Sequence, residues 1–362
     1  MRLITLAAIL LAASGAEPGA SAAPDTPDAP MTAAAASAQA TAGRAMPSEQ
    51  RGFRDWLAVC DNGNACFAFG PSADKSAWVR VAMAPGPDAR PQVSAGYWSS
   101  GEDEGGFALA IHGVDFPLTL VDPDGQAGSV PADRAMEAVR ALADGRRGEI
   151  GSGGELSLAG AAAALLWIDE RQGRVGTVTA LRRQGARPAS AVPAPPPLPV
   201  VRPAPAVSQA GYGETGQTLP QSIEDLPKVE ACRADTSHSE SFQKEVVSAR
   251  LDADHELWGV PCFMGAYNMG HEWFITGPGG RDPRPARLTS TSGEPESLTI
   301  NGGYAPNART LVAFAKGRGV GDCGTASTWT WTGREFVLSH ELEMRECWGV
   351  PVDFWPTTWR TR

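Results

Sequence analysis

The chain has 362 residues, and its 41 acidic and 31 basic side chains give a formal net charge of −10 at pH 7. This acidic balance disfavours nucleic acid and anionic membrane surfaces as partners. The length allows two domains of ordinary size, each of which could bury a hydrophobic core of its own.

The N-terminus has the pattern of a secretory signal peptide. A positive charge at Arg2 precedes a mainly apolar run over residues 3–13, and small residues follow it. The run is too short to cross a bilayer as a mature helix. We therefore predict that residues 1–22 are a signal peptide, cleaved after Ala16 or Ala22, and that the mature protein is periplasmic or secreted. No later stretch has the roughly 18 apolar residues of a transmembrane helix, so no transmembrane segment is expected after cleavage.

Two segments have compositions that favour linkers over packed structure. Residues 23–50 are mostly Ala, Pro, Ser and Thr, which predicts a disordered tether. Residues 187–218 begin with a proline-rich run that favours polyproline II, a semi-rigid spacer. Recognition of this run by a partner protein is the alternative. The sequence thus predicts a first domain over residues 51–186 and a second over residues 219–362.

The first domain combines helix and strand signals. Met136, Val139 and Leu142 are spaced as on one helix face, and an Ala-rich stretch ends at Gly173. Helices are predicted over 132–143 and 158–171, and strands over 77–83, 93–98, 106–112, 116–121 and 175–182. The expected fold class is α+β, with two helices set against an antiparallel sheet.

The second domain is predicted to be mainly β, with helical signal limited to a turn or two over residues 239–247. Gly, Pro and Asn separate its apolar runs. Strands are predicted over 256–263, 272–276, 286–289, 297–300, 310–315, 327–331 and 335–344. The last two strands are predicted to form a hairpin inside the block 316–348.

Six cysteines in an exported chain predict disulfides. No Cys-x-x-Cys pair exists in the sequence, which argues against a thioredoxin-like redox site and a ribbon-type zinc site. An Asn62-Gly63 turn between apolar runs predicts a hairpin that sets Cys60 opposite Cys66. The remaining cysteines are paired by topology: each pair flanks one stretch of the second domain, giving Cys232–Cys262 and Cys323–Cys347.

Three histidine–glutamate pairs suggest a metalloprotease, but the pattern is incomplete. His255-Glu256, His271-Glu272 and His340-Glu341 all lack the second histidine four positions after the first. The two imidazoles that such a metal site needs are therefore missing. We interpret these residues as solvated strand residues.

Two further motifs could indicate a binding site, and each also has a simpler structural explanation. Residues 319–324 match Gly-x-Gly-x-x-Gly, but a strand is predicted after them where a dinucleotide site needs a helix. The glycines are expected instead to allow positive φ and close packing around Cys323. Asp252, Asp254 and Glu256 alternate and could face calcium, although alternating acids on a solvated face are commoner. No cofactor and no metal site is predicted.

Tryptophans crowd the C-terminal tenth of the chain, at Trp329, Trp331, Trp348, Trp355 and Trp359. In a small β domain such residues usually fill the core, and where exposed they can stack on sugars or anchor interfaces. Trp355 and Trp359 follow the last predicted strand. These two are therefore the candidates for a contact surface.

Several short blocks together resemble an exported bacterial family known as domain of unknown function 1176, from about Phe53 to Arg362. The opening block also resembles the start of invasion-associated locus B proteins. The resemblance implies an exported, cysteine-bearing protein and no established activity. The matching blocks are Phe53-Arg54-Asp55-Trp56, Cys60-Asp61-Asn62 with Cys66, Val260-Pro261-Cys262 through Gly265-Ala266-Tyr267-Asn268, Lys316-Gly317-Arg318-Gly319 through Gly321-Asp322-Cys323-Gly324, and Trp331, Gly333, Phe336, Leu338 and Cys347.

The function predicted from these observations is non-enzymatic. We expect an exported binding or interaction protein whose partner is an envelope protein or a glycan. The alternative is an envelope hydrolase, or a hydrolase inhibitor, that uses carboxylates such as Asp252, Asp254 or Asp322. A purely structural role is the third possibility, in which only the disulfides matter.

Overall fold

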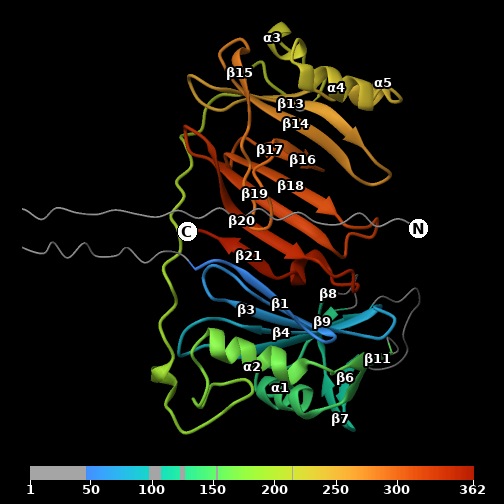
Figure 1. Cartoon of the computed structure of the whole chain (residues 1–362), viewed down its shortest axis with the longest axis vertical. Helices are drawn as coiled ribbons and strands as arrows, with labels where there is room; N and C mark the ends of the chain where they lie inside the picture. Colours follow the sequence, from blue (N-terminus) through green and yellow to red (C-terminus); the bar gives the residue numbers. More distant parts are fainter. Residues whose placement is uncertain (1–45, 98–106, 123–126, 152–153, 214) are drawn as a thin grey trace, which may run out of the picture. The chain divides into compact units, whose positions relative to one another are not determined.

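The computed structural model describes residues 46–97, 107–122, 127–151, 154–213 and 215–362, and residues 43–362 form one compact unit (Figure 1). The predicted signal peptide and most of the predicted tether lie outside the described residues. The first strand begins at Glu49, just before the predicted start of the first domain. The fold is mainly β, with few helices.

Seven antiparallel strands form the first sheet, in the order β1-β2-β3-β4-β5-β9-β8. The predicted hairpin register is confirmed, because Cys60 lies opposite Cys66 across the Asn62-Gly63 turn. The strands are β1 (Glu49–Phe53), β2 (Trp56–Cys60), β3 (Cys66–Pro71), β4 (Ala77–Met83), β5 (Pro91–Tyr97), β8 (Thr119–Asp122) and β9 (Ala127–Ser129).

Two helices and a four-stranded sheet pack against this first sheet. The helices are α1 (Ala135–Asp144) and α2 (Ala161–Arg171), close to the predicted bounds. Val139, Leu142 and Leu165 share one buried cluster with alternate residues of β2. The four-stranded sheet has the order β11-β10-β6-β7, from β6 (Ala108–Ile111), β7 (Val114–Pro117), β10 (Arg147–Ile150) and β11 (Glu155–Ser157).

The predicted strand over 175–182 is wrong, because the segment folds into turns. The buried carboxylate of Asp169 accepts the backbone N–H groups of Leu181, Arg182 and Arg183, at 2.7, 2.8 and 3.1 Å. These are N–H groups that a strand would donate to a neighbouring strand. A single buried acid at the end of α2 therefore folds the segment back.

The second half contains two sheets of five strands each. One has the order β12-β13-β14-β15, with β16 also paired to β14, and the other has the order β17-β18-β19-β20-β21. The strands are β12 (Val247–Arg250), β13 (Glu256–Met264), β14 (Met269–Gly277), β15 (Arg281–Pro285), β16 (Leu298–Ile300), β17 (Gly303–Ala305), β18 (Thr310–Lys316), β19 (Gly324–Trp331), β20 (Phe336–Met344) and β21 (Thr357–Arg360).

Several elements of this half differ from the prediction. The strand expected over 286–289 lies earlier in the chain, as β15, and β21 was not predicted. Helical structure is also more extensive: α3 (Gln221–Glu224) and α4 (Pro227–Asp235) precede α5 (Glu240–Gln243). Helix α4 lies against β13 (Figure 1), where Val229 and Cys232 face Val260 and Cys262 in one buried cluster.

The two halves share a hydrophobic core, and the two-domain description is not confirmed. Successive residues of β2 face opposite sides of the sheet. Ala58 belongs to the cluster with the helices, whereas Val59 belongs to a cluster with Met344, Trp348 and Val350. The first sheet is thus covered by its own helices on one face and by the C-terminal segment on the other.

The proline-rich segment is docked along the second half. The backbone N–H of Ala204 donates to the carbonyl of Trp331 at 2.9 Å, and Arg362 donates to Pro199 at 2.9 Å. Val201 in turn donates to the carbonyl of Arg362 at 3.2 Å. Ala204 is 8% exposed and packs in the core of the second half. This segment is therefore held against the fold at several points and is not a free spacer.

Candidate functional site

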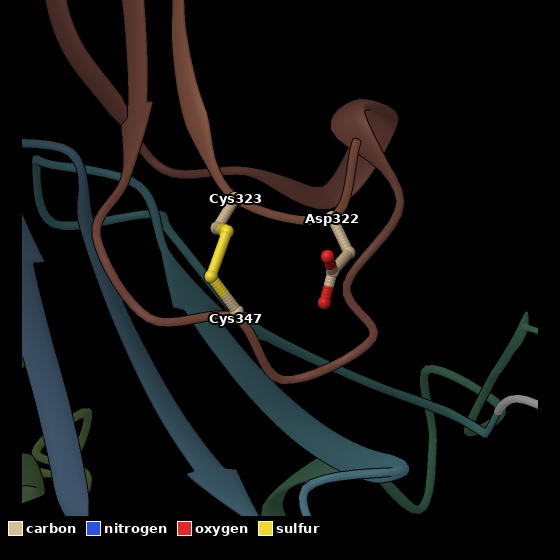
Figure 2. A group of neighbouring side chains, drawn as sticks. All are labelled: Asp322, Cys323 and Cys347. Atoms are coloured by element: carbon tan, nitrogen blue, oxygen red, sulfur yellow. A yellow bond between two sulfur atoms is a disulfide. The ribbon is translucent and has the colours of Figure 1, made fainter. Parts of the chain in front are cut away.

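The three predicted disulfides are present, as Cys60–Cys66, Cys232–Cys262 and Cys323–Cys347. The third joins the loop before β19 to the loop after β20. Figure 2 shows its two sulfur atoms bonded to each other beside the carboxylate of Asp322.

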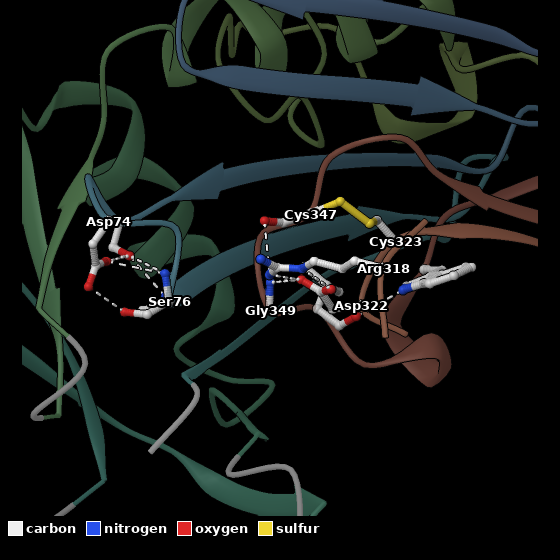
Figure 3. A network of polar contacts seen from close by, with 11 residues as sticks. Asp74, Ser76, Arg318, Asp322, Cys323, Cys347 and Gly349 are labelled. Atoms are coloured by element: carbon white, nitrogen blue, oxygen red, sulfur yellow. Dashed lines mark hydrogen bonds and ion pairs between the residues drawn. A yellow bond between two sulfur atoms is a disulfide. The ribbon is translucent and has the colours of Figure 1, made fainter. Parts of the chain in front are cut away.

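Asp322 is the hub of a polar network around this disulfide (Figure 3). Its side chain is 2% exposed and accepts hydrogen bonds from Nε and Nη2 of Arg318, at 2.6 and 2.5 Å. The backbone N–H of Gly349 donates to the same carboxylate at 2.7 Å. Burial raises the pKa of Asp322, but these donors outweigh burial and hold its pKa below the usual range.

This cluster has a structural role, because it fixes the loop before β19 to the loop after β20. Asp322, Cys323 and Cys347 form the one grouping of three potential metal-binding side chains among the described residues. Both thiols, however, are consumed by the disulfide, and the carboxylate is occupied by Arg318 and Gly349. A Cβ at Gly324 would lie 2.0 Å from the carbonyl oxygen of Ala315, so the loop also needs glycine there. Gly324 therefore allows close packing, and Gly321 and Gly324 supply positive φ, as predicted, whereas Gly319 shows neither feature.

The structure brings together two blocks that carry the family resemblance. The amide of Asn268, in the β13–β14 turn, donates to the carbonyl of Lys316 at 2.9 Å and accepts from its N–H at 3.3 Å. Gly319 lies against the ring of Tyr267. These residues are therefore explained at least in part by the packing of one turn on another.

The alternating acids Asp252, Asp254 and Glu256, at and just before the start of β13, do not converge on a common point. Asp252 accepts hydrogen bonds from the N–H of Asp254, from Nδ1 of His255 and from Nε1 of Trp331, each at 2.9 Å. Glu256 instead accepts from Tyr212 at 2.8 Å and from two backbone N–H groups of the β14–β15 turn. The carboxylates of Asp252 and Glu256 are thus occupied in separate networks, and Asp254 is exposed, which does not favour the calcium alternative.

The prediction that the three glutamates after histidine are solvated is wrong. Glu256, Glu272 and Glu341 are 5%, 2% and 0% exposed. Glu272 is held by the hydroxyl of Ser297 and by Lys228, whose Nζ lies 3.4 Å away. Sequence alternation places these acids on strands, but their donors come from distant segments, so burial could not be foreseen.

Trp355, one of the two residues expected at a contact surface, is buried in the structure. It is 2% exposed, and its Nε1 donates to the carbonyl of Val350 at 2.8 Å. The unpredicted strand β21 continues the fold past it. Trp359, in that strand, is half-buried and donates to Leu338 at 3.0 Å. It lines a shallow cavity of about 290 Å³ and so stays partly accessible.

A second cavity, of about 280 Å³, was not suggested by the sequence. One wall is formed by β16 and the segment before it. The other wall is the face of strands β18, β19 and β20 that carries Ala313, Ser327 and Glu341. Among the described residues, no basic side chain lines the cavity. The lining residues are Leu288, Ser290, Ser292, Gly293, Glu294, Glu296, Leu298, Thr299, Ile300, Ala313, Ala315, Thr325, Ser327, Trp329 and Glu341.

Glu341 is the buried acid of this cavity. Its carboxylate accepts the hydroxyl and the backbone N–H of Thr291, the hydroxyl of Thr358 at 2.7 Å and, more weakly, that of Ser327 at 3.5 Å. Within the described ranges, the donors that hold the carboxylate are thus all neutral. Trp329 lies on the same strand face as Ser327, and its Nε1 donates to the carbonyl of Thr289 at 2.6 Å.

Comparisons with known proteins agree with the family resemblance. The model of the family described as "Protein of unknown function (DUF1176)" matches residues 50–362. The chain is 30% identical over 341 residues to the protein described as "Uncharacterized protein YpfG" of Escherichia coli K12, covering 86% of this chain and 93% of that relative. No solved structure matches, and the resemblance to invasion-associated locus B proteins is not shown.

None of the helices in the described ranges is both long enough and apolar enough to span a membrane. The family match extends from the first strand of the first sheet to the last residue, and so includes the shared core, the disulfides and the whole lining of the cavity beside Glu341. The chain belongs to the DUF1176 family of proteins of unknown function.

Proposed function

We propose that this protein is an exported, non-enzymatic binding protein that takes a neutral saccharide in the cavity beside Glu341. The observation that carries the proposal is the chemistry of the lining. An indole, several hydroxyls and carboxylates surround about 280 Å³, and no basic residue is among them. This volume lies near the lower end of the range of small-ligand pockets, roughly 300–1,000 Å³.

Saccharide recognition needs an apolar wall and acceptors for hydroxyl groups. Trp329, Leu298 and Ile300 supply apolar surface, and Glu294 and Glu296 supply exposed carboxylates at the rim. Aromatic rings combine a large apolar face with a polar edge, which suits a sugar ring. The absence of cations from the lining disfavours a phosphate or carboxylate ligand at this cavity.

Export is part of the same proposal. The N-terminal pattern is typical of a signal peptide, and three disulfides fit an oxidising compartment. An envelope protein as the partner is the other possibility in this class, and the half-buried Trp359 would be its natural contact.

The test is calorimetric titration of the full mature chain with a panel of neutral mono- and disaccharides. Ala313→Leu should fill the cavity and abolish binding. Thr325→Val removes one lining hydroxyl while keeping the side-chain shape, and should weaken binding about three- to tenfold, the value of one hydrogen bond. Thr328→Val, on the opposite face of β19, is the matched control and should bind as the wild type does.

Absence of binding across the panel, or equal binding by Ala313→Leu, would sink the proposal. Release of new reducing ends during incubation would instead favour the carboxylate-based hydrolase. A purely structural role predicts that only variants lacking a disulfide differ from the wild type.

A further inference from the structure

A third cavity, of about 580 Å³, lies between the first half of the chain and the loop after β20, and we infer that it binds an acidic saccharide through a uronate or phosphate group. It shares no lining residue with the cavity beside Glu341 and does not depend on it. Its lining is Arg54, Asp55, Pro71, Ser72, Ala73, Lys75, Arg146, Arg147, Glu155, Ser157, Glu346 and Trp348.

Three separate turns each bring one cation to this cavity. Arg54 lies between β1 and β2, Lys75 between β3 and β4, and Arg146 between α1 and β10. All three side chains are exposed. No hydrogen bond or ion pair to another residue of the described chain occupies any of them, so their charges are available to a ligand.

The acidic residues of the cavity leave an excess of positive charge. Of the four basic and three acidic lining residues, Arg147 and Glu155 form an ion pair at 3.1 Å. Asp55 accepts the hydroxyl of Ser157 at 2.5 Å. Three free cations then face two carboxylates, one excess positive charge in a chain whose net charge is −10. An anionic group is therefore favoured here, although the chain as a whole repels anions.

The ligand class follows from what else the cavity offers. Arginine recognises carboxylate and phosphate oxygens with paired hydrogen bonds. Asp55 and Glu346 are acceptors, which suit hydroxyl groups, and Trp348, 6% exposed, contributes to the wall. The volume is well above that of an inorganic ion and within the range of small-ligand sites. A sugar that carries one acidic group satisfies the cations and the acceptors together.

The turn that carries Lys75 is held rigidly. Asp74 accepts the hydroxyls of Ser72 and Ser76 at 2.5 and 2.8 Å, and Figure 3 shows the Asp74–Ser76 contacts beside the Asp322 network. The ammonium group therefore projects from a fixed backbone. Lys75 and Arg54 have φ of 63° and 55°, a left-handed conformation that glycine adopts without steric cost.

This conformation permits charge removal without damage to the fold. Arg54→Gly and Lys75→Gly should keep or raise the melting temperature of the protein, because they relieve the strain at positive φ. Arg146→Gln removes the third charge at similar length. Arg90→Gln, at an exposed arginine that does not line the cavity, is the control for net charge.

The experiment is calorimetric titration of the full mature chain at low salt with glucuronate, glucose 6-phosphate, glucose and inorganic phosphate. An acidic sugar should bind more tightly than glucose and than inorganic phosphate. Each of the three cavity variants should weaken its binding about tenfold, as expected for one charge-assisted hydrogen bond. Arg90→Gln and the Ala313→Leu variant of the other cavity should leave it unchanged.

Glucuronate and glucose 6-phosphate distinguish the source of the negative charge on the ligand. Tighter binding of glucuronate indicates a uronate, and tighter binding of glucose 6-phosphate indicates a phosphorylated sugar. Binding of inorganic phosphate as tightly as glucose 6-phosphate would overturn the saccharide assignment. Equal affinity in the three cavity variants, with melting temperatures maintained, would overturn the site. Loss of neutral-sugar binding by Ala313→Leu tests the proposed function separately.

Discussion

Asn62 and Arg360 exchange two hydrogen bonds across almost the whole length of the chain. The side-chain amide of Asn62 donates to the carbonyl of Arg360 at 2.8 Å and accepts from its backbone N–H at 2.9 Å. Nε of Arg360 also lies 2.6 Å from the buried carboxylate of Asp61. The turn of the first hairpin therefore completes the last strand, as a neighbouring strand would.

Replacing Asn62 should destabilise the whole fold. Asn62→Ala leaves the backbone N–H and carbonyl of Arg360 without partners in a site where Asn62 is 0% exposed. An unsatisfied buried polar group costs about 1–3 kcal/mol, so we expect the free energy of unfolding to fall by roughly 2–4 kcal/mol. Urea denaturation measures it, with the exposed Asn307→Ala as a control that should change nothing.

The same urea denaturation experiment also tests whether the two halves share one core. Because Val59 packs with Met344 and Val350, the two halves should unfold in one transition. Two separate transitions would contradict the shared core and would support the two-domain description.

The loss of stability on removal of each disulfide should increase with the length of the loop that the disulfide closes. The sequence separations are 6 for Cys60–Cys66, 24 for Cys323–Cys347 and 30 for Cys232–Cys262. In the chain-entropy model, paired Cys→Ala replacement costs about 2 kcal/mol for the first and about 3.5 kcal/mol for the other two. Urea denaturation of the three double variants gives the order. A larger loss for the short loop would show that native contacts outweigh chain entropy.

The proline-rich segment should resist proteolysis in the native protein. Trypsin is a poor probe because Arg187 and Arg202 both precede proline. Elastase, which cuts after small residues, should leave residues 187–207 intact, since backbone hydrogen bonds to Trp331 and Arg362 hold the segment. Ala204→Asp, which places a charge in a buried position, should release the segment and permit cleavage. Rapid cleavage of the wild type there would mean that the segment is a free spacer.

Local signals in the sequence predicted much of the fold. The Asn62-Gly63 turn fixes the first hairpin and with it the Cys60–Cys66 pair. Helices α1 and α2 were predicted because their apolar spacing and glycine stops lie within the segments themselves. β15 shows the limit: Arg281–Pro285 has no apolar pattern, and an edge strand can hold two prolines because one of its sides needs no partner.

The parts that sequence could not predict depend on distant partners. β21 becomes a strand because it pairs with β20, as Arg360 does with His340. Glu341 is buried because Thr291 and Thr358 donate to it from other segments. The Arg54–Lys75–Arg146 grouping likewise depends on three turns that are far apart in sequence. Both proposed sites were therefore invisible before the fold was known.

Stability should fall as the pH is lowered below about 6.5, and His271 should be one cause. The imidazole is 9% exposed and lies between Phe242 and Trp273, with Nε2 3.1 Å from the carbonyl of Glu245. A carbonyl can only accept, so Nε2 carries the proton of a neutral ring. Burial lowers the pKa of His271, and the carbonyl of Glu245 only partly offsets this effect.

The sign of the pH effect follows from proton binding. Below the unperturbed imidazole pKa, near 6.5, the unfolded chain binds a proton that the folded chain does not bind until its lowered pKa is reached. The free energy of unfolding therefore falls as the pH drops through this window, by at most about 1.4 kcal/mol per pH unit for each such histidine. Partial desolvation and the nearby charge of Arg360 also lower the pKa of His340, but this side chain is exposed, so solvent screening weakens its contribution to the fall.

The measurement is urea denaturation at several pH values between 7.5 and 5. His271→Gln should flatten the dependence of the free energy of unfolding on pH, leaving the smaller slope that His340 contributes. This holds whatever the substitution does to stability at pH 7.5. The exposed His238→Gln should keep the full slope of the wild type. Asp61 works in the opposite direction, because burial raises its pKa despite Arg360, and His271→Gln leaves this contribution in place. An unchanged slope in His271→Gln would show that the ring gains its proton without loss of its packing.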